Sequence, residues 1–268
     1  MTESVPGGQS AALTYTSYLA LDEVLSAQRP RSDEHDEMLF IVIHQVYELW
    51  FKQMLHELGI LQRSLEKGDA SHSVRTLRRV LTILKVVVAQ IDVLETMTPR
   101  QFTSFRTRLD ASSGFQSGQF RELEAVLGRR DRRMLTPYAP DSVAHERITA
   151  AMSRPAVFDS FLRYLAGSGY DVRAEHLDRD FRTQWTESED VQRILVQVYA
   201  DDSGPSTVAD LLVDLDEGLQ EWRYRHVKMV ERTIGGKTGT GGSAGVAYLR
   251  TTLFHATFPD LWSVRSQL

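Results

Sequence analysis

Apolar residues recur at every third or fourth position over two long neighbouring stretches of the chain. The first stretch, about residues 33–67, carries Leu39, Val42, Val46, Leu49, Phe51, Leu55, Leu58 and Leu61. The second, about residues 72–97, carries Val74, Leu77, Leu81, Leu84, Val88, Ile91 and Leu94. This spacing places side chains on one face of a helix, so both stretches are predicted to be long helices. The "KGD" at 67–69 predicts a short turn between two antiparallel helices, the start of a bundle.

The rest of the chain continues the helical pattern. A last long helix is predicted over about 207–234, where Gly235 and Gly236 end it. Shorter helices are expected between, and no stretch shows the alternation typical of strands. We therefore predict a single all-α domain over residues 1–268. Residues 1–12 are expected to form a flexible arm, 13–27 a first amphipathic segment, and 235–245 a glycine-rich lid loop.

Composition and charge exclude several classes of function. The chain has no cysteine, which excludes disulfides, thiolate catalysis and cysteine-ligated metals. A net charge of -5 gives no general attraction for nucleic acid or an anionic membrane. The basic run "GRRDRRM" at 128–134 is interrupted by Asp131 and is interpreted as a solvated turn. No signal peptide or membrane span is recognisable, so a cytoplasmic location is expected.

One histidine interrupts the most apolar part of the first long helix. His44 shares a helix face with Phe40, four residues before it, and with Tyr47 and Phe51 after it. Two interpretations stay open at this point. His44 is either a core residue bonded to a backbone carbonyl or a polar group that faces a pocket with aromatic walls.

A second histidine lies on the buried stripe of the last long helix. His226 follows Trp222 by four residues in "EWRYRHVKMVER" and is either a core residue or an axial ligand, with Trp222 as a neighbour that orients it. A single histidine is a standard proximal ligand of haem. The eight histidines are scattered and form no zinc or non-haem iron motif. A metal site is therefore expected to use one histidine and a macrocycle.

Polar residues outside these helices suggest a ligand with charged groups. Arg106 follows Phe105 on a predicted short helix, and an arginine beside aromatic rings suits an α-carboxylate, although a surface ion pair is the alternative. Ser113 lies in the loop "SSGFQS", where its hydroxyl either reaches a ligand or caps the next helix. Thr240 is the obvious polar contact in the glycine-rich "GTGGSAG", and Gly241 follows it.

Five segments together resemble the tryptophan 2,3-dioxygenase family. They are "LTYTSYL" (13–19), "EMLFIVIHQVYELWFKQMLHEL" (37–58), "FTSFRTRLDASSGFQSGQFR" (102–121), "EWRYRHVKMVERTIGGKTGTGGSAGVAYLR" (221–250) and "FPDLWSVRS" (258–266). They occur in the family's order and span nearly the whole chain. The segment of about 128–205 is less diagnostic.

The resemblance implies an all-α homotetramer with one b-type haem per subunit and O2 as co-substrate. It implies that His226 is the proximal iron ligand. His44 would be the distal residue that meets the indole N–H of L-tryptophan, and Arg106 would bind the substrate carboxylate. The other implied contacts are Phe40, Phe51 and Thr240 to substrate, Ser113, Trp222 and Gly241 on the haem side, and Tyr15 and Tyr18 from a neighbouring subunit's arm.

The implied reaction inserts O2 across the indole C2–C3 bond and yields N-formylkynurenine, the first step of tryptophan catabolism through kynurenine. One alternative is a monooxygenase that forms a 2-oxindole or a hydroxylated product from tryptophan or a substituted tryptophan. Another class is a haem or ligand sensor without turnover, and a third is a purely structural bundle. The joint presence of His44, Arg106 and Thr240 favours an enzyme.

Overall fold

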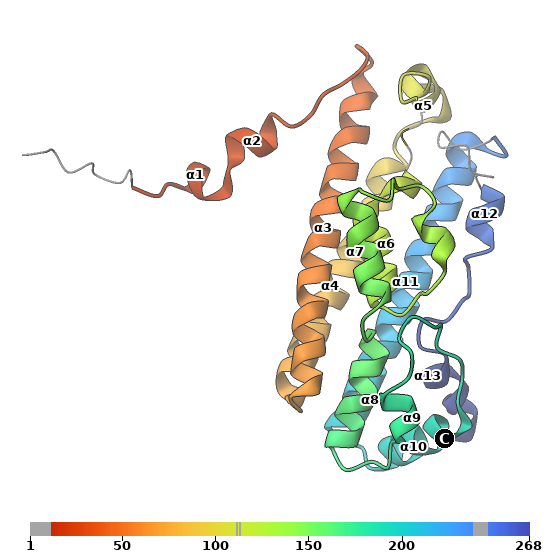
Figure 1. The fold of residues 1–268 in the computed structure, drawn as a ribbon. Coiled ribbons are helices and arrows are strands. Elements are labelled where there is room, and N and C mark those ends of the chain that lie inside the picture. The colour runs from red at the N-terminus through yellow and green to blue at the C-terminus, as the bar shows by residue number, and fades with distance from the viewer. Residues whose placement is uncertain (1–11, 111, 113, 238–245) are drawn as a thin grey trace, which may run out of the picture.

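The computed structural model describes residues 12–110, 112, 114–237 and 246–268, and over these residues the chain forms helices and turns with no strand (Figure 1). The predicted all-α class is confirmed. The α-helices are α1 Tyr15–Leu19, α2 Leu21–Leu25, α3 His35–Glu66, α4 Ala70–Leu94, α5 Pro99–Arg106, α6 Gly118–Val126, α7 Val143–Met152, α8 Val157–Gly167, α9 Ala174–Leu177, α10 Glu189–Ala200, α11 Gly204–Ile234, α12 Val246–Arg250 and α13 Pro259–Ser263. Three 3₁₀ turns join them at Gly114–Gln116, Arg132–Leu135 and Val264–Gln267.

The two long N-terminal helices, α3 and α4, form the predicted antiparallel pair. Gly68 takes a positive φ of 74° in the turn between them, a conformation that glycine adopts without strain. The carboxylate of Asp69 accepts a hydrogen bond from the backbone N–H of His72 at 2.9 Å and so caps α4. The turn residues named from the sequence therefore end one helix and begin the next.

The third long helix, α11, packs along α4 (Figure 1). It begins at Gly204, ahead of the predicted start near residue 207, because Pro205 is tolerated in the first turn of a helix. It ends at Gly235, as predicted. A Cβ on Gly218 would lie 2.7 Å from a methyl carbon of Leu84, so glycine at this position lets α11 and α4 approach closely.

The hydrophobic core lies along the three long helices, with α4 packed against both α3 and α11. Its fully buried side chains include Met54, Leu58, Leu61, Leu77, Val80, Ile91, Val208, Leu212 and Leu215. These residues lie on the apolar stripe of each helix, and the neighbouring helices cover them from water. None of the helices in the described ranges combines the length and the apolar composition of a membrane span.

The C-terminal segment is held against α11 by one buried carboxylate. Asp216 is fully buried and accepts hydrogen bonds from the backbone N–H groups of Thr257 and Phe258, at 2.7 and 3.0 Å. It also accepts one from the indole N–H of Trp262 at 2.9 Å. These bonds compensate for the burial of the charge. The preceding helix, α12, also packs against α11.

The described N-terminal residues leave the body of the bundle, as Figure 1 shows. The predicted amphipathic segment over 13–27 is two short helices, α1 and α2, separated at Ala20 by a left-handed φ of 50°. Neither helix buries a residue against its own chain. Tyr15 and Tyr18 are 75% and 71% exposed. The apolar face of this segment therefore has no partner within the described part of the chain.

The interpretation of the basic run at 128–134 as a solvated turn is wrong for its first half. Arg130 is buried, and its guanidinium donates to the backbone carbonyls of Ala125, Phe181 and Arg154. Arg132 and Arg133 are exposed, as expected of a turn. An arginine can replace its water shell with several carbonyl acceptors because it carries five N–H donors.

Candidate functional site

A cavity of about 500 Å³ opens between α3, α5, α6 and α11. Most of its wall is apolar, and ligand cavities of this size are usually lined in this way. The apolar lining residues include Phe40, Tyr47, Phe51, Ile91, Leu94, Met97, Phe102, Leu109, Phe120, Trp222, Val227, Met229, Val230, Ile234 and Leu249. The charged lining residues are His44, Glu48, Arg106, Arg121, Glu124, Arg223 and His226.

His44 lines this cavity from the middle of α3. A ring nitrogen, Nδ1, lies 2.7 Å from the backbone oxygen of Phe40. A carbonyl oxygen only accepts, so the proton of the neutral ring is on Nδ1 and Nε2 keeps a free lone pair. Burial lowers the pKa of His44, although the bond to Phe40 and the charge of Glu48 oppose the shift. The residue is thus both bonded to a carbonyl and part of a pocket wall, which combines the two interpretations left open above.

Aromatic rings form two groups around the cavity. Phe40 lies 4.1 Å from the His44 ring between centroids and 5.7 Å from Phe102. Phe51 belongs to the second group, with Phe120 at 5.4 Å and Trp222 at 6.3 Å. Phe40 therefore lies beside His44 and Phe51 lies toward α11. The wall is therefore largely aromatic and suits a flat, apolar ligand.

His226 lines the same cavity from α11. Its ring stacks on Trp222 with a centroid distance of 5.2 Å and an interplanar angle of 8°. Burial lowers the pKa of His226 to about 4, and the charges of His44 and Arg121 act in the same direction. Among the described residues, neither ring nitrogen has a hydrogen-bond partner. The side chain is therefore a neutral imidazole with a lone pair available to a ligand.

The remaining predicted site residues divide into three groups. Arg106 is the last residue of α5 and lines the cavity. This helix begins with a Thr98 capping box followed by Pro99, the predicted proline start. Ser113, Thr240 and Gly241 lie outside the described residues. Tyr15 and Tyr18 do not line the cavity of their own chain, because the arm that carries them leaves the bundle (Figure 1).

Part of the cavity wall was not predicted from the sequence. Phe102, Phe120 and Arg121 fall within the segment 102–121 that carries the family resemblance, so that segment contained the signal. Glu124 lies three residues beyond it. Arg223 falls within the segment 221–250 that carries the same resemblance, but nothing in the sequence indicates that it meets Glu124.

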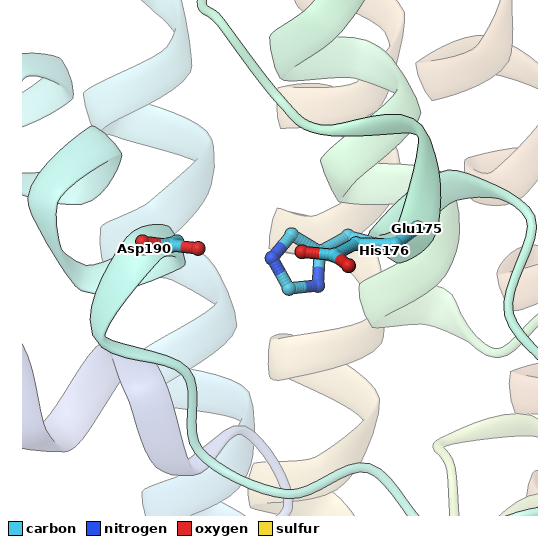
Figure 2. Close-up of side chains that lie close together, drawn as sticks. All are labelled: Glu175, His176 and Asp190. Carbon is cyan, nitrogen blue, oxygen red and sulfur yellow. The ribbon is translucent and has the colours of Figure 1, made fainter.

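A second group of titratable side chains lies away from this cavity. Figure 2 shows Glu175 and His176 on α9 beside Asp190 at the start of α10. One carboxylate oxygen of each acid and one ring nitrogen of His176 all lie within 4.8 Å of one another. Asp190 already forms ion pairs with Arg173 and Arg193. This arrangement is a partly exposed ion-pair network, and we assign no ligand to it.

Comparison with known proteins decides the family. The family model described as tryptophan 2,3-dioxygenase matches residues 3–145 and 139–268. A tryptophan 2,3-dioxygenase of Anaeromyxobacter sp. (strain K) is 65% identical over 98% of this chain and 99% of its own length. Those of Herpetosiphon aurantiacus and Caulobacter vibrioides are 54% and 44% identical, over 97% and 96% of this chain and 100% and 98% of their own. The chain belongs to the tryptophan 2,3-dioxygenase family.

Members of this family use haem and O2, and the cavity fits that cofactor. Haem needs an apolar slot with an axial ligand on one wall. His226 is the residue that could hold the haem iron, because among the described residues its ring nitrogens have no hydrogen-bond partner, and aromatic rings line the space in front of it. The tryptophan 2,3-dioxygenase resemblance noted in the sequence is thereby confirmed.

Proposed function

We propose that this chain is a haem-dependent dioxygenase that converts L-tryptophan and O2 to N-formylkynurenine. The observation that carries the proposal is a single apolar cavity lined by two neutral histidines from different helices, His44 on α3 and His226 on α11. A flat cofactor and an indole ring both fit between aromatic walls. The family membership supports the same reaction.

His226 would hold the haem iron. Burial keeps its imidazole neutral, as an axial ligand must be, and stacking on Trp222 restricts rotation of the ring. Bound haem supplies the activation of O2. The protein's part is to bind and orient the substrate and to exclude water from the cavity.

His44 would orient the indole. Its proton is held at Nδ1 by the carbonyl of Phe40, so Nε2 is free to accept a hydrogen bond from the indole N–H. The Phe40 ring beside it would contact the indole face. In this arrangement His44 fixes the position of C2 and C3 without removing a proton.

Arg106 would bind the substrate carboxylate at the end of the cavity formed by α5. A guanidinium donates two parallel hydrogen bonds to a carboxylate, which sets orientation as well as affinity. Roles for Phe51 on the substrate, for Ser113 and Gly241 beside the haem, and for Thr240 at the substrate ammonium stay predictions. The lid over 235–245, the single-domain organisation and a cytoplasmic location stay predictions too.

Product mass tests the proposed reaction. The purified protein, reduced without air, is expected to show the Soret band of haem. Addition of L-tryptophan and ¹⁸O2 should then give a product that carries both labelled oxygen atoms. A product with one labelled oxygen would indicate a monooxygenase, and binding of tryptophan without turnover would indicate a sensor.

The substitutions His44→Ala and His44→Ser are expected to slow the reaction but not to abolish it. The lost hydrogen bond is worth about 0.5–1.5 kcal/mol. Since each ~1.36 kcal/mol is a factor of ten, the rate should fall by roughly ten-fold. Steady-state kinetics with tryptophan and with 1-methyltryptophan, which has no indole N–H to donate, measures the effect.

The two substrates separate an orienting acceptor from an obligatory base. As an acceptor, His44 matters less for 1-methyltryptophan, so the variants should lose less activity on that substrate. As a base, it would leave 1-methyltryptophan inert with the parent enzyme. Variants that bind haem and substrate but are inactive on both would contradict the orienting role.

We further propose a homotetramer in which the arm of one subunit completes the cavity of a neighbour. Six large apolar side chains of this arm are exposed, namely Leu13, Tyr15, Tyr18, Leu19, Val24 and Leu25. Hydrogen bonds fix the residues that join this arm to α3. The side chain of Gln45 bonds to the side chain of Gln28 and to the carbonyl of Ala27. Buried Glu37 accepts hydrogen bonds from the backbone N–H groups of Arg31 and Ser32. An apolar segment held away from its own chain suits a second copy.

Deletion of residues 1–19 is expected to leave haem bound but to raise KM and impair turnover, because Tyr15 and Tyr18 are removed while His226 is kept. Deletion of residues 1–11 is the matched control and should be nearly silent. Haem content, subunit mass in solution and kinetics are the measurements. A fully active monomer would contradict the arm exchange.

Mixed subunits give a sharper test of the exchange. Chains that lack residues 1–19 have an intact cavity, and His226→Ala chains have an intact arm. Unfolding and refolding the two together should give more activity than the two variants show when each is refolded alone. Failure to restore activity in mixed tetramers would show that each arm serves its own chain.

A further inference from the structure

A buried carboxylate lies where the N-terminal arm meets α3. Glu37, in the first turn of α3, is 1% exposed. It does not line the cavity of its own chain, so neither substrate nor cofactor accounts for its burial. A buried charge needs hydrogen bonds that replace those of water. The partners of Glu37 therefore show what the residue does.

The hydrogen bonds of Glu37 come from residues 27–32, the segment that leads from α2 to α3 and is called here the arm root. One carboxylate oxygen accepts from the backbone N–H of Arg31 and the other from that of Ser32, both at 2.8 Å. The hydroxyl of Ser32 donates a third bond at 2.5 Å. Burial by itself would raise the pKa of Glu37, but these bonds outweigh it and lower the pKa. The ionised carboxylate thus ties the arm root to α3.

A second attachment of the arm root lies two turns further along α3. The side-chain amide of Gln28 donates to the side-chain oxygen of Gln45 at 2.7 Å and to the backbone oxygen of Val24, in α2, at 3.1 Å. The amide of Gln45 donates to the backbone oxygen of Ala27 at 3.3 Å. Glu37 and Gln45 are about 12 Å apart along the helix axis. A segment bonded at two such points has a fixed direction, and α2 is fixed with it.

The two attachments place the arm level with the cavity but directed away from it. Gln45 directly follows His44, which lines the cavity. Neighbouring residues of a helix point roughly 100° apart, so the face that holds the arm root is turned away from the cavity. The arm then leaves the bundle (Figure 1). In a symmetric pair of subunits, contacts are reciprocal, and each arm is free to serve the cavity of the other.

We propose that Glu37 is a positioning residue for the neighbouring subunit: its carboxylate fixes the exit of the arm so that Tyr15 and Tyr18 reach the neighbour's cavity. The inference rests on the arm exchange proposed above. Both oxygens are needed, because each accepts from a different N–H. In Glu37→Gln an amide NH2 replaces one oxygen and turns a donor toward an N–H. The arm root is then held less firmly, and the effective concentration of the arm at the neighbour's cavity falls.

Mixed tetramers test this effect across subunits. The recipient chain lacks residues 1–19 but keeps Glu37 and an intact cavity. The donor chain carries His226→Ala, so it supplies an arm but no active cavity, and it is made with and without Glu37→Gln. The two chains are co-expressed with different tags and purified through both tags.

The KM for tryptophan is the measurement that separates the two donors. With the donor that keeps Glu37, KM should be near that of the parent. With the Glu37→Gln donor, KM should rise roughly ten-fold or more, the factor expected when a hydrogen bond to a charged group is lost. Haem content per recipient chain should be equal in both, because the recipient is the same. A Gln45→Ala donor, which loses the second attachment, should raise KM in the same direction.

Glu57→Gln in the donor is the matched control. Glu57 is another buried glutamate of α3, 2% exposed, and it accepts hydrogen bonds from Gln53 and Arg79 instead of from the arm root. A donor with this substitution should give the same KM as the donor that keeps both glutamates.

The outcomes are distinct. Active mixed tetramers with the same KM for the Glu37→Gln donor and the unchanged donor would overturn the inference, because Glu37 would then serve only its own chain. An equally large rise with the Glu57→Gln donor would overturn it too. If the Glu37→Gln donor does not assemble, the Gln45→Ala donor decides by the same comparison. No gain of activity in any mixed tetramer would refute the arm exchange, and the inference with it, whereas an inactive parent would refute the proposed reaction.

Discussion

The His226→Ala variant is expected to lose stoichiometric haem. Among the described residues that line the cavity, His226 alone has a neutral ring with no hydrogen-bond partner on either nitrogen, and the chain has no cysteine to replace it. Haem content by absorbance, together with the ferrous spectrum, measures the effect. Any haem that remains should be weakly held and inactive, because the axial bond that positions the iron is gone.

Added imidazole sharpens this test. Imidazole should enter the space left in His226→Ala and restore part of the ferrous spectrum, as a free ligand that takes the place of the side chain. His56→Ala, an exposed position on α3 outside the cavity, is the control and should keep its haem. Normal haem content and a native ferrous spectrum in His226→Ala would refute the assignment of the ligand.

Substitution of Arg106 is expected to weaken tryptophan binding strongly. Loss of a buried charged hydrogen bond costs on the order of 2–5 kcal/mol. At ~1.4 kcal/mol for each factor of ten, binding should weaken by roughly thirty-fold to a few thousand-fold. Arg106→Lys should resemble Arg106→Ala, because an ammonium group does not reproduce the planar pair of donors. Tryptophan titrations followed through the haem spectrum give the dissociation constants.

Substrate analogues decide whether Arg106 acts through the carboxylate. Indole compounds without a carboxylate, such as tryptamine, should bind the parent and the variants almost equally. Arg108→Ala, an exposed position two residues away, should leave tryptophan binding unchanged. If the Arg106 variants lose tryptamine as strongly as tryptophan, the residue has a structural role.

The all-α class was predictable because a helix that buries one face requires apolar residues at every third or fourth position of the sequence. The helices α3, α4 and α11 span 32, 25 and 31 residues, so their apolar stripes repeat over many turns, and the boundaries at Gly68 and Gly235 carry residues that end helices for local steric reasons. The short elements were less predictable. The segment over 13–27 has an amphipathic pattern, but a left-handed residue at Ala20 divides it.

The two histidines show where sequence reasoning stops. From the pattern alone, His44 and His226 were each either core residues or pocket residues, since both lie on apolar stripes. The family resemblance favoured a pocket for both. Only the packing of α4 against both α3 and α11 shows that they line one cavity, and only the bond to Phe40 shows which nitrogen of His44 carries the proton.

The sequence by itself determined the all-α class, the long helices and the residues that carry the family resemblance, because each depends on local periodicity or on a contiguous motif. The tertiary structure decided the pairing of charges. Glu124 meets Arg223 across 99 positions of chain, and Arg130 is buried by carbonyls from Phe181 and Arg154. Whether a charged side chain is solvated or buried depends on which groups, distant in the sequence, pack around it. The residues next to it in the sequence do not reveal those groups.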